Sequence, residues 1–329
     1  MNRPLIFLAA SMCAAVAVTS ACYAKAHQPG IDASNIRFTA EAGQQPGEIQ
    51  LSLRSGRDNG NFSHGFGTGE LAGLDRAVLD SGRAGPVRFT LTRDAGRIDC
   101  DGQAAARRAT GTCRFTADAA FGDYLAKNGM PRPTVDESYG LAVTGATRDL
   151  VDGLVQAKYA VDDVDDLMGL AAVGVTRGYI ADLAGRGYRP DDTSDLVAFG
   201  ALKISPAYID AMSRSGYPRL DADAIVQFKA LDISPDYIRA LASAGYPNLS
   251  SDDIAGMKAV GVTPEFMAKF RQAGFANLKS DELIQLKIFN VDTKDLEQLR
   301  REGVPVTAEA LVERKIFGGH RPGRGRDRD

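Results

Sequence analysis

Apolar and polar residues recur with a fixed 29-residue period along the C-terminal part of the chain. The segment LVAFGALKISPAYIDAMSRSGYPRLDADA, beginning at Leu196, is followed by IVQFKALDISPDYIRALASAGYPNLSSDD, beginning at Ile225. Further good copies begin at Leu167, Ile254 and Leu283, and weaker ones at Ser138 and Val312. A period of this size is typical of a solenoid, in which each unit buries its apolar face against its neighbours.

Each unit contains a helix whose start and end are both marked by single residues. The tenth position carries a side chain that can accept a hydrogen bond from the first helical turn, which predicts the N-caps Thr176, Ser205, Ser234, Thr263 and Asp292. Eleven residues later a glycine suits the left-handed conformation that ends a helix, which predicts the C-cap glycines Gly187, Gly216, Gly245, Gly274 and Gly303. Apolar residues on either side of each N-cap form a hydrophobic staple.

A second helix precedes this one in each unit. Ser250 is the predicted N-cap of one such helix, and Ile254, Met257 and Val260 follow it at helical spacing. Helices this short are not stable alone, so packing between units must stabilise them. Residues 138–317 are therefore predicted to form an all-α array of helix pairs.

The N-terminal part has a different pattern. Apolar and polar residues alternate in five short segments, which predicts strands at 36–39, 49–53, 87–92, 97–101 and 112–116. We expect a small antiparallel sheet of consecutive hairpins within residues 27–130. The polar stretch 102–111 and the glycine-rich stretch 59–69 (NGNFSHGFGTG) are interpreted as loops, and 71–79 and 121–125 as short helices. The predicted fold class is thus α+β, with a β-domain followed by a helical-repeat solenoid.

Three further segments lie outside these two domains. Residues 1–26 resemble a cleavable export signal, with Arg3, an apolar run from Leu5 to Val18, and the small-x-small site Ala24-Lys25-Ala26. The run is too short for a confident membrane span, and Thr19 disfavours a lipoprotein anchor at Cys22. Residues 131–137, with two prolines, are predicted to be a linker. The Arg/Gly-rich residues 318–329 are predicted to be disordered.

Charge and cysteine content narrow the possible functions. The 329 residues are 44% hydrophobic and 25% charged, with a net charge of −3 that becomes more negative once Arg3 and Lys25 are removed. A net negative charge disfavours binding to nucleic acid, because the phosphate backbone is also negative. Cys100 and Cys113 are the two cysteines left after cleavage, and an even number in an exported chain predicts a disulfide. A zinc site would need more N and S ligands.

Candidate chemistry is sparse. His64 lies among Gly65, Gly67 and Gly69, but the spacing fits neither a dinucleotide-binding nor a P-loop motif. The acidic cluster Asp162, Asp163, Asp165 and Asp166 lacks the glycine and spacing of an EF-hand, and acidic residues are favoured where a helix begins. We therefore predict no catalytic residue, no cofactor and no metal.

Aromatic residues also recur with the 29-residue period. They occupy two positions in each unit, at Tyr179, Tyr208, Tyr237 and Phe266, and at Tyr188, Tyr217, Tyr246 and Phe275. They suit either packing between units or a ladder on which sugar rings stack. Packing is the favoured interpretation, because the positions adjoin the staple and the C-cap.

The repeat pattern I/V-S/T-P-x-Y/F-I followed by G-Y/F-x-x-L and acidic residues resembles a helical repeat of bacterial envelope proteins. Similar repeats also occur attached to some antirepressor metallopeptidases of the β-lactam-sensor type. The segment VRFTLTRDAGRIDCDG…GTCRF resembles the small β-domain that accompanies them, so the resemblance covers roughly residues 36–317. It implies an envelope location. The peptidase motif His-Glu-x-x-His is absent from this sequence, so that activity is not implied.

These observations lead to one main hypothesis and two alternatives. The main hypothesis is a non-enzymatic, exported and periplasmic scaffold that binds another envelope protein through its repeats, without stable membrane insertion. One alternative is a carbohydrate- or peptidoglycan-binding module that uses the tyrosines. The other is an enzyme or inhibitor with a site around His64. Partner identity is not encoded in any motif.

Overall fold

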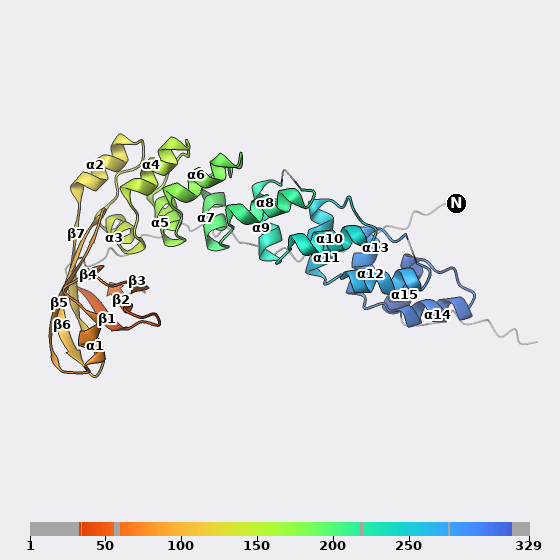
Figure 1. Cartoon of the computed structure of the whole chain (residues 1–329), viewed down its shortest axis with the longest axis horizontal. Coiled ribbons are helices and arrows are strands. Elements are labelled where there is room, and N and C mark those ends of the chain that lie inside the picture. The colour runs from red at the N-terminus through yellow and green to blue at the C-terminus, as the bar shows by residue number, and fades with distance from the viewer. Residues whose placement is uncertain (1–32, 34, 56–59, 218–219, 276, 318–329) are drawn as a thin grey trace, which may run out of the picture.

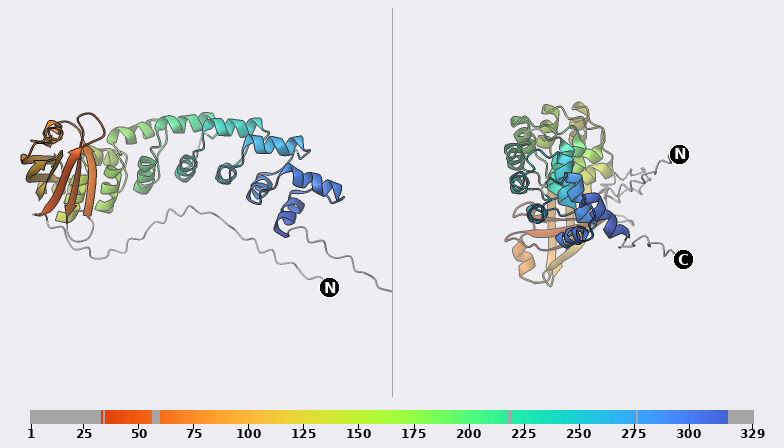
Figure 2. Two further views of the ribbon diagram at one scale, coloured as in Figure 1. Left: turned by 90° about the horizontal axis from the view of Figure 1, so that it is seen from below. Right: turned by 90° about the vertical axis from the view of Figure 1, so that its right-hand side faces the viewer.

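The computed structural model describes residues 33, 35–55, 60–217, 220–275 and 277–317. A curled antiparallel sheet stands at one end of the molecule, and a long, gently curved helical array extends from it (Figures 1 and 2). The predicted α+β class, with a β-domain followed by a helical-repeat array, is confirmed. The expected export signal and C-terminal tail lie outside the described residues.

The sheet has seven strands in the order β3-β2-β1-β7-β6-β5-β4. Their bounds are β1 Ile36–Ala42, β2 Ile49–Ser55, β3 Gly60–Phe66, β4 Leu71–Ala72, β5 Gly85–Arg93, β6 Gly96–Ala105 and β7 Arg108–Ala117. Successive hairpins make up both halves of the sheet. The halves join because β1 pairs with β7, so the first and last strands of the domain lie side by side.

Side-chain alternation gives the sheet one apolar and one polar face. Phe38, Leu51, Phe89 and Ile98 point to the apolar face and are at most 2% exposed. The short helix α1 (Arg76–Asp80) and the first helix of the array, α3 (Val135–Thr144), pack on this domain. Burial of these side chains explains why the alternating segments form strands and not loops.

The predicted disulfide is confirmed. Cys100 on β6 and Cys113 on β7 are directly paired in the strand register, and their sulfur atoms are bonded. Both residues are buried, at 0% and 2% exposure. The bond therefore joins neighbouring strands inside the core.

Three expectations for this domain were wrong. Residues 60–66 are not loop but the edge strand β3, in which Phe62 and Phe66 face the core side and the polar His64 occupies the core-side position between them. Residues 102–111 continue the β6–β7 hairpin, whose turn is only Ala106-Arg107, both with positive φ. The helix expected at 71–79 is shorter, because Leu71 and Ala72 form β4.

The helical array consists of two helices per 29 residues, as the repeat predicts. The first helices of successive units are α3, α5 (Val164–Ala172), α7 (Thr193–Ala201), α9 (Ala222–Ala230), α11 (Ser251–Ala259), α13 (Ser280–Ile288) and α15 (Ala308–Phe317). The second helices are α4 (Arg148–Gln156), α6 (Arg177–Gly185), α8 (Pro206–Arg214), α10 (Pro235–Ser243), α12 (Pro264–Gln272) and α14 (Thr293–Arg301). The Val312 copy contributes only α15 to the described residues.

Each first helix packs against the first helix of the next unit, from α3 on α5 to α13 on α15. Within a unit the two helices are steeply inclined, as α5 and α6 meet at 85°. The first helices therefore form one layer, and the second helices run along the array as another (Figure 2). Position four of the repeat supplies the fully buried residues Leu170, Phe199, Phe228, Met257 and Leu286.

The array begins directly on the sheet. α3 contacts β6 and β7, and Phe115 meets Tyr139 edge to face with ring centroids 5.5 Å apart. Asp94, in the β5–β6 turn, accepts a 2.7 Å hydrogen bond from the backbone N–H of Arg148 at the start of α4. The expected linker 131–137 is shorter than predicted, because Thr134 caps α3 and the helix begins at Val135.

The helix α2 (Ala119–Lys127), which the sequence predicts only at 121–125, packs against α4. Among the described residues no single helix is long and apolar enough to cross a membrane; α5 and α6 reach that length only together, and they are sharply bent.

Candidate functional site

The N-cap residues of the second helices lie where the repeat pattern places them. The hydroxyls of Thr176, Ser205, Ser234 and Thr263 each accept a 3.2 Å hydrogen bond from the backbone N–H three residues on. Asp292 accepts from the N–H groups of Lys294 and Asp295. These residues stabilise the array, and their polar groups are engaged by their own helices.

Both helices of a unit end in a left-handed residue. The predicted glycines have positive φ: Gly187, Gly216, Gly245, Gly274 and Gly303. The first helices end in the same way, at Gly145, Gly174, Lys203, Asp232, Gly261 and Asn290. This second series was not predicted because half of its members are not glycine, the residue that most often ends a helix with a positive φ.

The recurring tyrosines join one unit to the next. The hydroxyls of Tyr179, Tyr208 and Tyr237 donate to the carbonyls of Ile204, Ile233 and Val262, at 2.6, 2.9 and 2.9 Å. At the other aromatic position, the hydroxyls of Tyr217 and Tyr246 donate to the carbonyls of Leu249 and Leu278, each at 2.6 Å. Burial raises the pKa of Tyr179, Tyr208 and Tyr237 to about 12.

Lysines cover several of these rings. The Nζ atoms of Lys229, Lys258 and Lys287 lie 5.0, 4.9 and 5.1 Å from the rings of Tyr208, Tyr237 and Phe266. At the equivalent place beside Tyr179 stands Gly200, and both residues line a hollow of about 270 Å³. The aromatic positions therefore serve mainly as packing between units, and the covered rings do not form a continuous stacking surface for sugars.

His64 lies near two aromatic rings and one carboxylate. It is exposed on the edge strand β3, between Phe62 and Phe66, with ring centroids 6.0 and 5.2 Å away. The nearby carboxylate of Glu70 is held by Arg93 at 2.9 Å. Burial alone would raise the pKa of Glu70, but hydrogen bonds from Arg93 and the N–H of Gly67 outweigh it and lower the pKa.

The acidic cluster has a local structural role. Asp163 is the N-cap of α5, and Asp165 and Asp166 lie in its first turn. Partial burial raises the pKa of Asp166, although a hydrogen bond with Thr193 opposes the rise. Across the described ranges no group of three or more His, Cys, Asp or Glu side chains could hold a metal ion.

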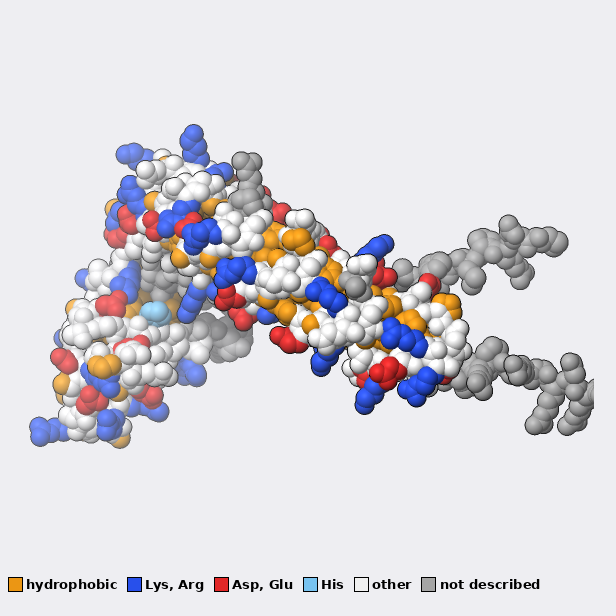
Figure 3. Space-filling model, turned by 45° about the vertical axis from the view of Figure 1, so that its right-hand side comes forward, with side chains coloured by type: hydrophobic (Ala, Val, Ile, Leu, Met, Phe, Trp, Pro, Cys, Tyr) orange, Lys and Arg blue, Asp and Glu red, His pale blue; other side chains and the backbone are white. Residues whose placement is uncertain are grey.

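Large apolar side chains are exposed at the end of the array farthest from the sheet. We define the distal patch as Ile288 and Phe289 at the end of α13 and Ile316 and Phe317 at the end of α15, with exposures of 56%, 37%, 49% and 71%. α13 and α15 pack side by side, so the patch is shared by two neighbouring helix ends. Figure 3 shows hydrophobic side chains reaching the surface along the array and at its end.

The distal patch departs from the repeat. The sixth position of the four preceding units is the small, exposed residue Ala172, Ala201, Ala230 or Ala259, whereas the last two units have Ile288 and Phe317 there. Reading the repeat in register could have found these residues, because the change from alanine to large apolar side chains is visible in the sequence. Their exposure, however, depends on the described array ending at α15.

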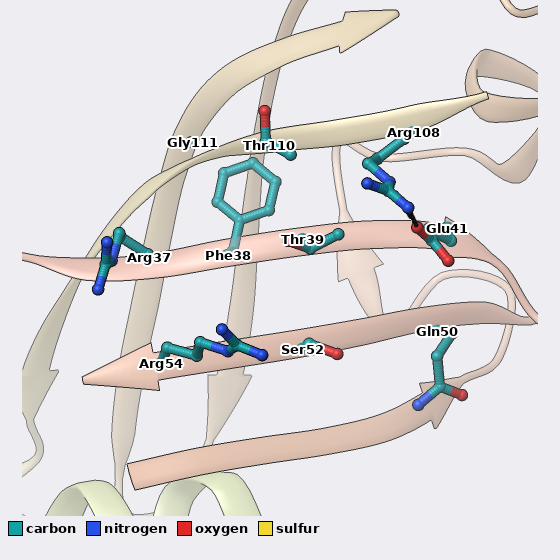
Figure 4. A pocket seen from close by; sticks show the side chains of 10 residues that line it. All are labelled: Arg37, Phe38, Thr39, Glu41, Gln50, Ser52, Arg54, Arg108, Thr110 and Gly111. Atoms are coloured by element: carbon teal, nitrogen blue, oxygen red, sulfur yellow. Dashed lines mark hydrogen bonds and ion pairs between the residues drawn. The ribbon is translucent and has the colours of Figure 1, made fainter. Parts of the chain in front are cut away.

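A polar hollow lies on the other domain. We define the sheet groove as the hollow of about 450 Å³ on β1, β2 and β7, lined by Arg37, Thr39, Glu41, Gln50, Ser52, Arg54, Arg108 and Thr110, with Phe38 and Gly111 (Figure 4). Arg108 and Glu41 form an ion pair of 2.5 Å at one end. Arg37 and Arg54 lie at the other end.

Together, the fold and these surfaces define a class: a two-part protein made of a disulfide-bonded antiparallel sheet and a helical-repeat array. No family model matches the chain, and no curated protein matches it significantly. The function must therefore be inferred from the surfaces themselves.

Proposed function

We propose that this protein is a non-enzymatic, exported scaffold of the bacterial envelope that binds a partner protein through its helical array. The observation that carries the proposal is the distal patch. Four large apolar side chains are exposed at two neighbouring helix ends there, and two of them, Ile288 and Phe317, replace the alanine found at the same position of the four preceding units. Contiguous exposed apolar surface is typical of protein interaction sites.

The array is suited to presenting such a surface. Its units pack only on their neighbours, so it forms a long support that holds the distal patch away from the sheet (Figure 1). The ends of Arg314 and Lys315 are occupied by ion pairs with Glu302 and Asp295. The partner surface that fits is therefore apolar, and the ion pairs form part of a polar rim around it.

Export is supported by the sequence of residues 1–26, by the paired cysteines and by the resemblance of the repeat to envelope proteins. The non-enzymatic proposal is supported by the engagement of the recurring tyrosines and N-cap hydroxyls in the array. The position of His64 between the rings of Phe62 and Phe66 agrees with it.

The test compares protein captured from an envelope extract by the mature chain and by an Ile288→Ser/Phe317→Ser variant. We expect one dominant partner to be captured by the wild type and to be lost with the variant. Val155→Ser is the matched control, because Val155 is also an exposed apolar residue of the array, at 42% exposure, but lies at its opposite end. Equal capture by all three proteins would contradict the proposal.

Sedimentation of the purified mature protein separates a different partner from a second copy of the chain. We expect a monomer at the concentrations used for capture. A wild-type dimer that the Ile288→Ser/Phe317→Ser variant cannot form would show that the distal patch is a self-association surface, and would contradict a role in binding another protein.

A further inference from the structure

The sheet groove contains two arginines that face each other and have no carboxylate partner among the described residues. Arg37 on β1 and Arg54 on β2 are directly opposed in the strand register, and both are exposed. In the described part of the chain neither side chain forms an ion pair. Like charges directly opposite each other destabilise a sheet, so an arrangement of this kind is well suited to an anionic ligand.

The neighbouring carboxylates do not neutralise this pair. Glu41, four residues further along β1, is bound to Arg108 at 2.5 Å. Thr112 on β7 pairs with Arg37 on one side and with Asp101 on β6 on the other. Asp101 is bound to Arg88 at 2.6 Å. These two acidic residues therefore each hold another arginine, and among the described residues the Arg37–Arg54 end of the groove keeps two positive charges.

The middle of the groove is lined by uncharged polar groups. Thr39 pairs with Ser52 on one side and with Thr110 on the other, so three hydroxyl side chains form a row across β2, β1 and β7. Ser63 on β3 links to Ser52 and Gln50, each at 2.9 Å. Hydroxyl and amide groups both donate and accept hydrogen bonds, as the hydroxyls of a sugar do.

Size and shape agree with this chemistry. The groove holds about 450 Å³ and follows β1 from Arg37 to Glu41, a distance of about 13 Å for four residues of strand. The ring of Phe38 points to the opposite, apolar face of the sheet and is only 2% exposed, so a ligand in the groove would not stack on it. Figure 4 shows the basic end and the Glu41–Arg108 end separated by the polar row.

We propose that the sheet groove binds an acidic saccharide. Arg37 and Arg54 hold its carboxylate or phosphate group, and Thr39, Ser52, Gln50 and Thr110 bind its hydroxyls. This site is independent of the distal patch, so either proposal can fail without the other. It also differs from sugar binding on the tyrosines, which are engaged in packing between units.

Calorimetric titration of the mature protein at low ionic strength tests the site. The probes are galacturonate and glucose 6-phosphate, with glucose and inorganic phosphate as the neutral and sugar-free comparisons. We expect both acidic sugars to bind. Glucose and phosphate should bind at least about tenfold more weakly than the acidic sugars, because each provides only half of the contacts. Phosphate binding as tightly as glucose 6-phosphate would overturn the assignment to a saccharide.

Three variants assign the binding to these residues. Arg37→Gln and Arg54→Gln should each weaken binding of the acidic sugars about tenfold or more, since each removes a charge-assisted hydrogen bond. Arg97→Gln is the matched control, because Arg97 is exposed on β6 outside the groove and the charge change is the same. An equal loss in Arg97→Gln, or no binding of either acidic sugar to the wild type, would overturn the proposal.

Urea unfolding of the unliganded variants separates a binding role from a structural one. Removing one of two opposed positive charges should leave the stability unchanged or increase it at low salt. A clear loss of stability in Arg37→Gln or Arg54→Gln would show that the arginines support the sheet, and would count against a ligand site. A linear oligomer of galacturonate that binds more tightly than the monomer would identify a polymer as the source of the saccharide.

Discussion

The sheet and the array bury their apolar side chains through contacts of different range. In the sheet, β1 pairs with β7, and the ion pair between Glu41 and Arg108 joins residues 67 positions apart. In the array, each first helix packs on the first helix one unit away. The sheet therefore depends on all its strands at once, whereas the array is stabilised unit by unit. A destabilising substitution in one region should therefore leave the stability of the other region unchanged.

The largest expected effect comes from the array core. Phe228 on α9 is fully buried and contacts Tyr217, so Phe228→Ala should destabilise the surrounding units by about 3–5 kcal/mol. Hydrogen exchange measured by mass spectrometry should then show lost protection in α7 to α12, with the strands unchanged. Gln227→Ala, at the exposed neighbouring position, is the control. Loss of protection throughout the sheet would break the distinction between the two regions.

Loss of the disulfide should destabilise the sheet and leave the array unchanged. Replacing Cys100 and Cys113 by alanine removes a cross-link between residues 13 apart, which costs about 3 kcal/mol in the chain-entropy account. We expect faster exchange in β1 to β7 and little change in α7 to α15. A reducing agent should have no further effect on this double variant. Unchanged strand protection would mean that the bond adds nothing to the stability of the sheet.

A smaller effect is expected at the N-caps. Ser234→Ala removes the acceptor for the N–H of Tyr237 and should cost about 1 kcal/mol, measured by urea unfolding followed by circular dichroism. Ser194→Ala, inside the first turn of α7, provides a serine that is not the N-cap of its helix. A similar loss in both variants would show that the effect does not come from capping.

The last pair of substitutions compares the contact between two central units, at Tyr237, with the contact one unit further from the sheet, at Phe266. Tyr237→Phe removes the hydrogen bond to the carbonyl of Val262 and should cost about 1 kcal/mol at neutral pH. Phe266 occupies the same repeat position one unit later, where the equivalent carbonyl is that of Val291. Phe266→Tyr should therefore be neutral or stabilising. A destabilised Phe266→Tyr would show that the distal junction has a different geometry.

Alkaline pH gives a second test of the same tyrosines. Burial raises the pKa of Tyr179, Tyr208 and Tyr237 to about 12, above the ordinary value of about 10. Between pH 10 and 12 the unfolded phenols lose protons that the folded ones keep. Stability therefore falls as pH rises through this window, having been fully present below it. Tyr237→Phe should show a shallower fall than the wild type in urea unfolding.

The array was largely predictable because its signals are local. Caps such as Ser205 and Thr263, and glycines such as Gly216, define a helix within about ten residues, and the period repeats them. The left-handed residues Lys203, Asp232 and Asn290 were missed because they are not glycine, although Asp and Asn adopt positive φ more often than most other residues.

The sheet was less predictable because its order depends on distant pairings. Alternation located most strands, but nothing near Arg37 indicates that Arg54 and Thr112 lie opposite it. The groove follows from that register and from the polar face it assembles. The edge strand β3 was hidden because the polar His64 occupies the core-side position between Phe62 and Phe66 and the stretch is rich in glycine. The distal patch lay within reach of the repeat analysis, since Ile288 and Phe317 replace alanines.

Binding of a partner at the distal patch is the central claim, and an exchange footprint tests it most directly. The captured partner is added to the mature protein, and amide hydrogen exchange is compared with that of the free chain. We predict added protection in α13 and α15, which carry Ile288, Phe289, Ile316 and Phe317. Protection confined to the sheet or to α2–α6, with α13 and α15 unchanged, would contradict the account.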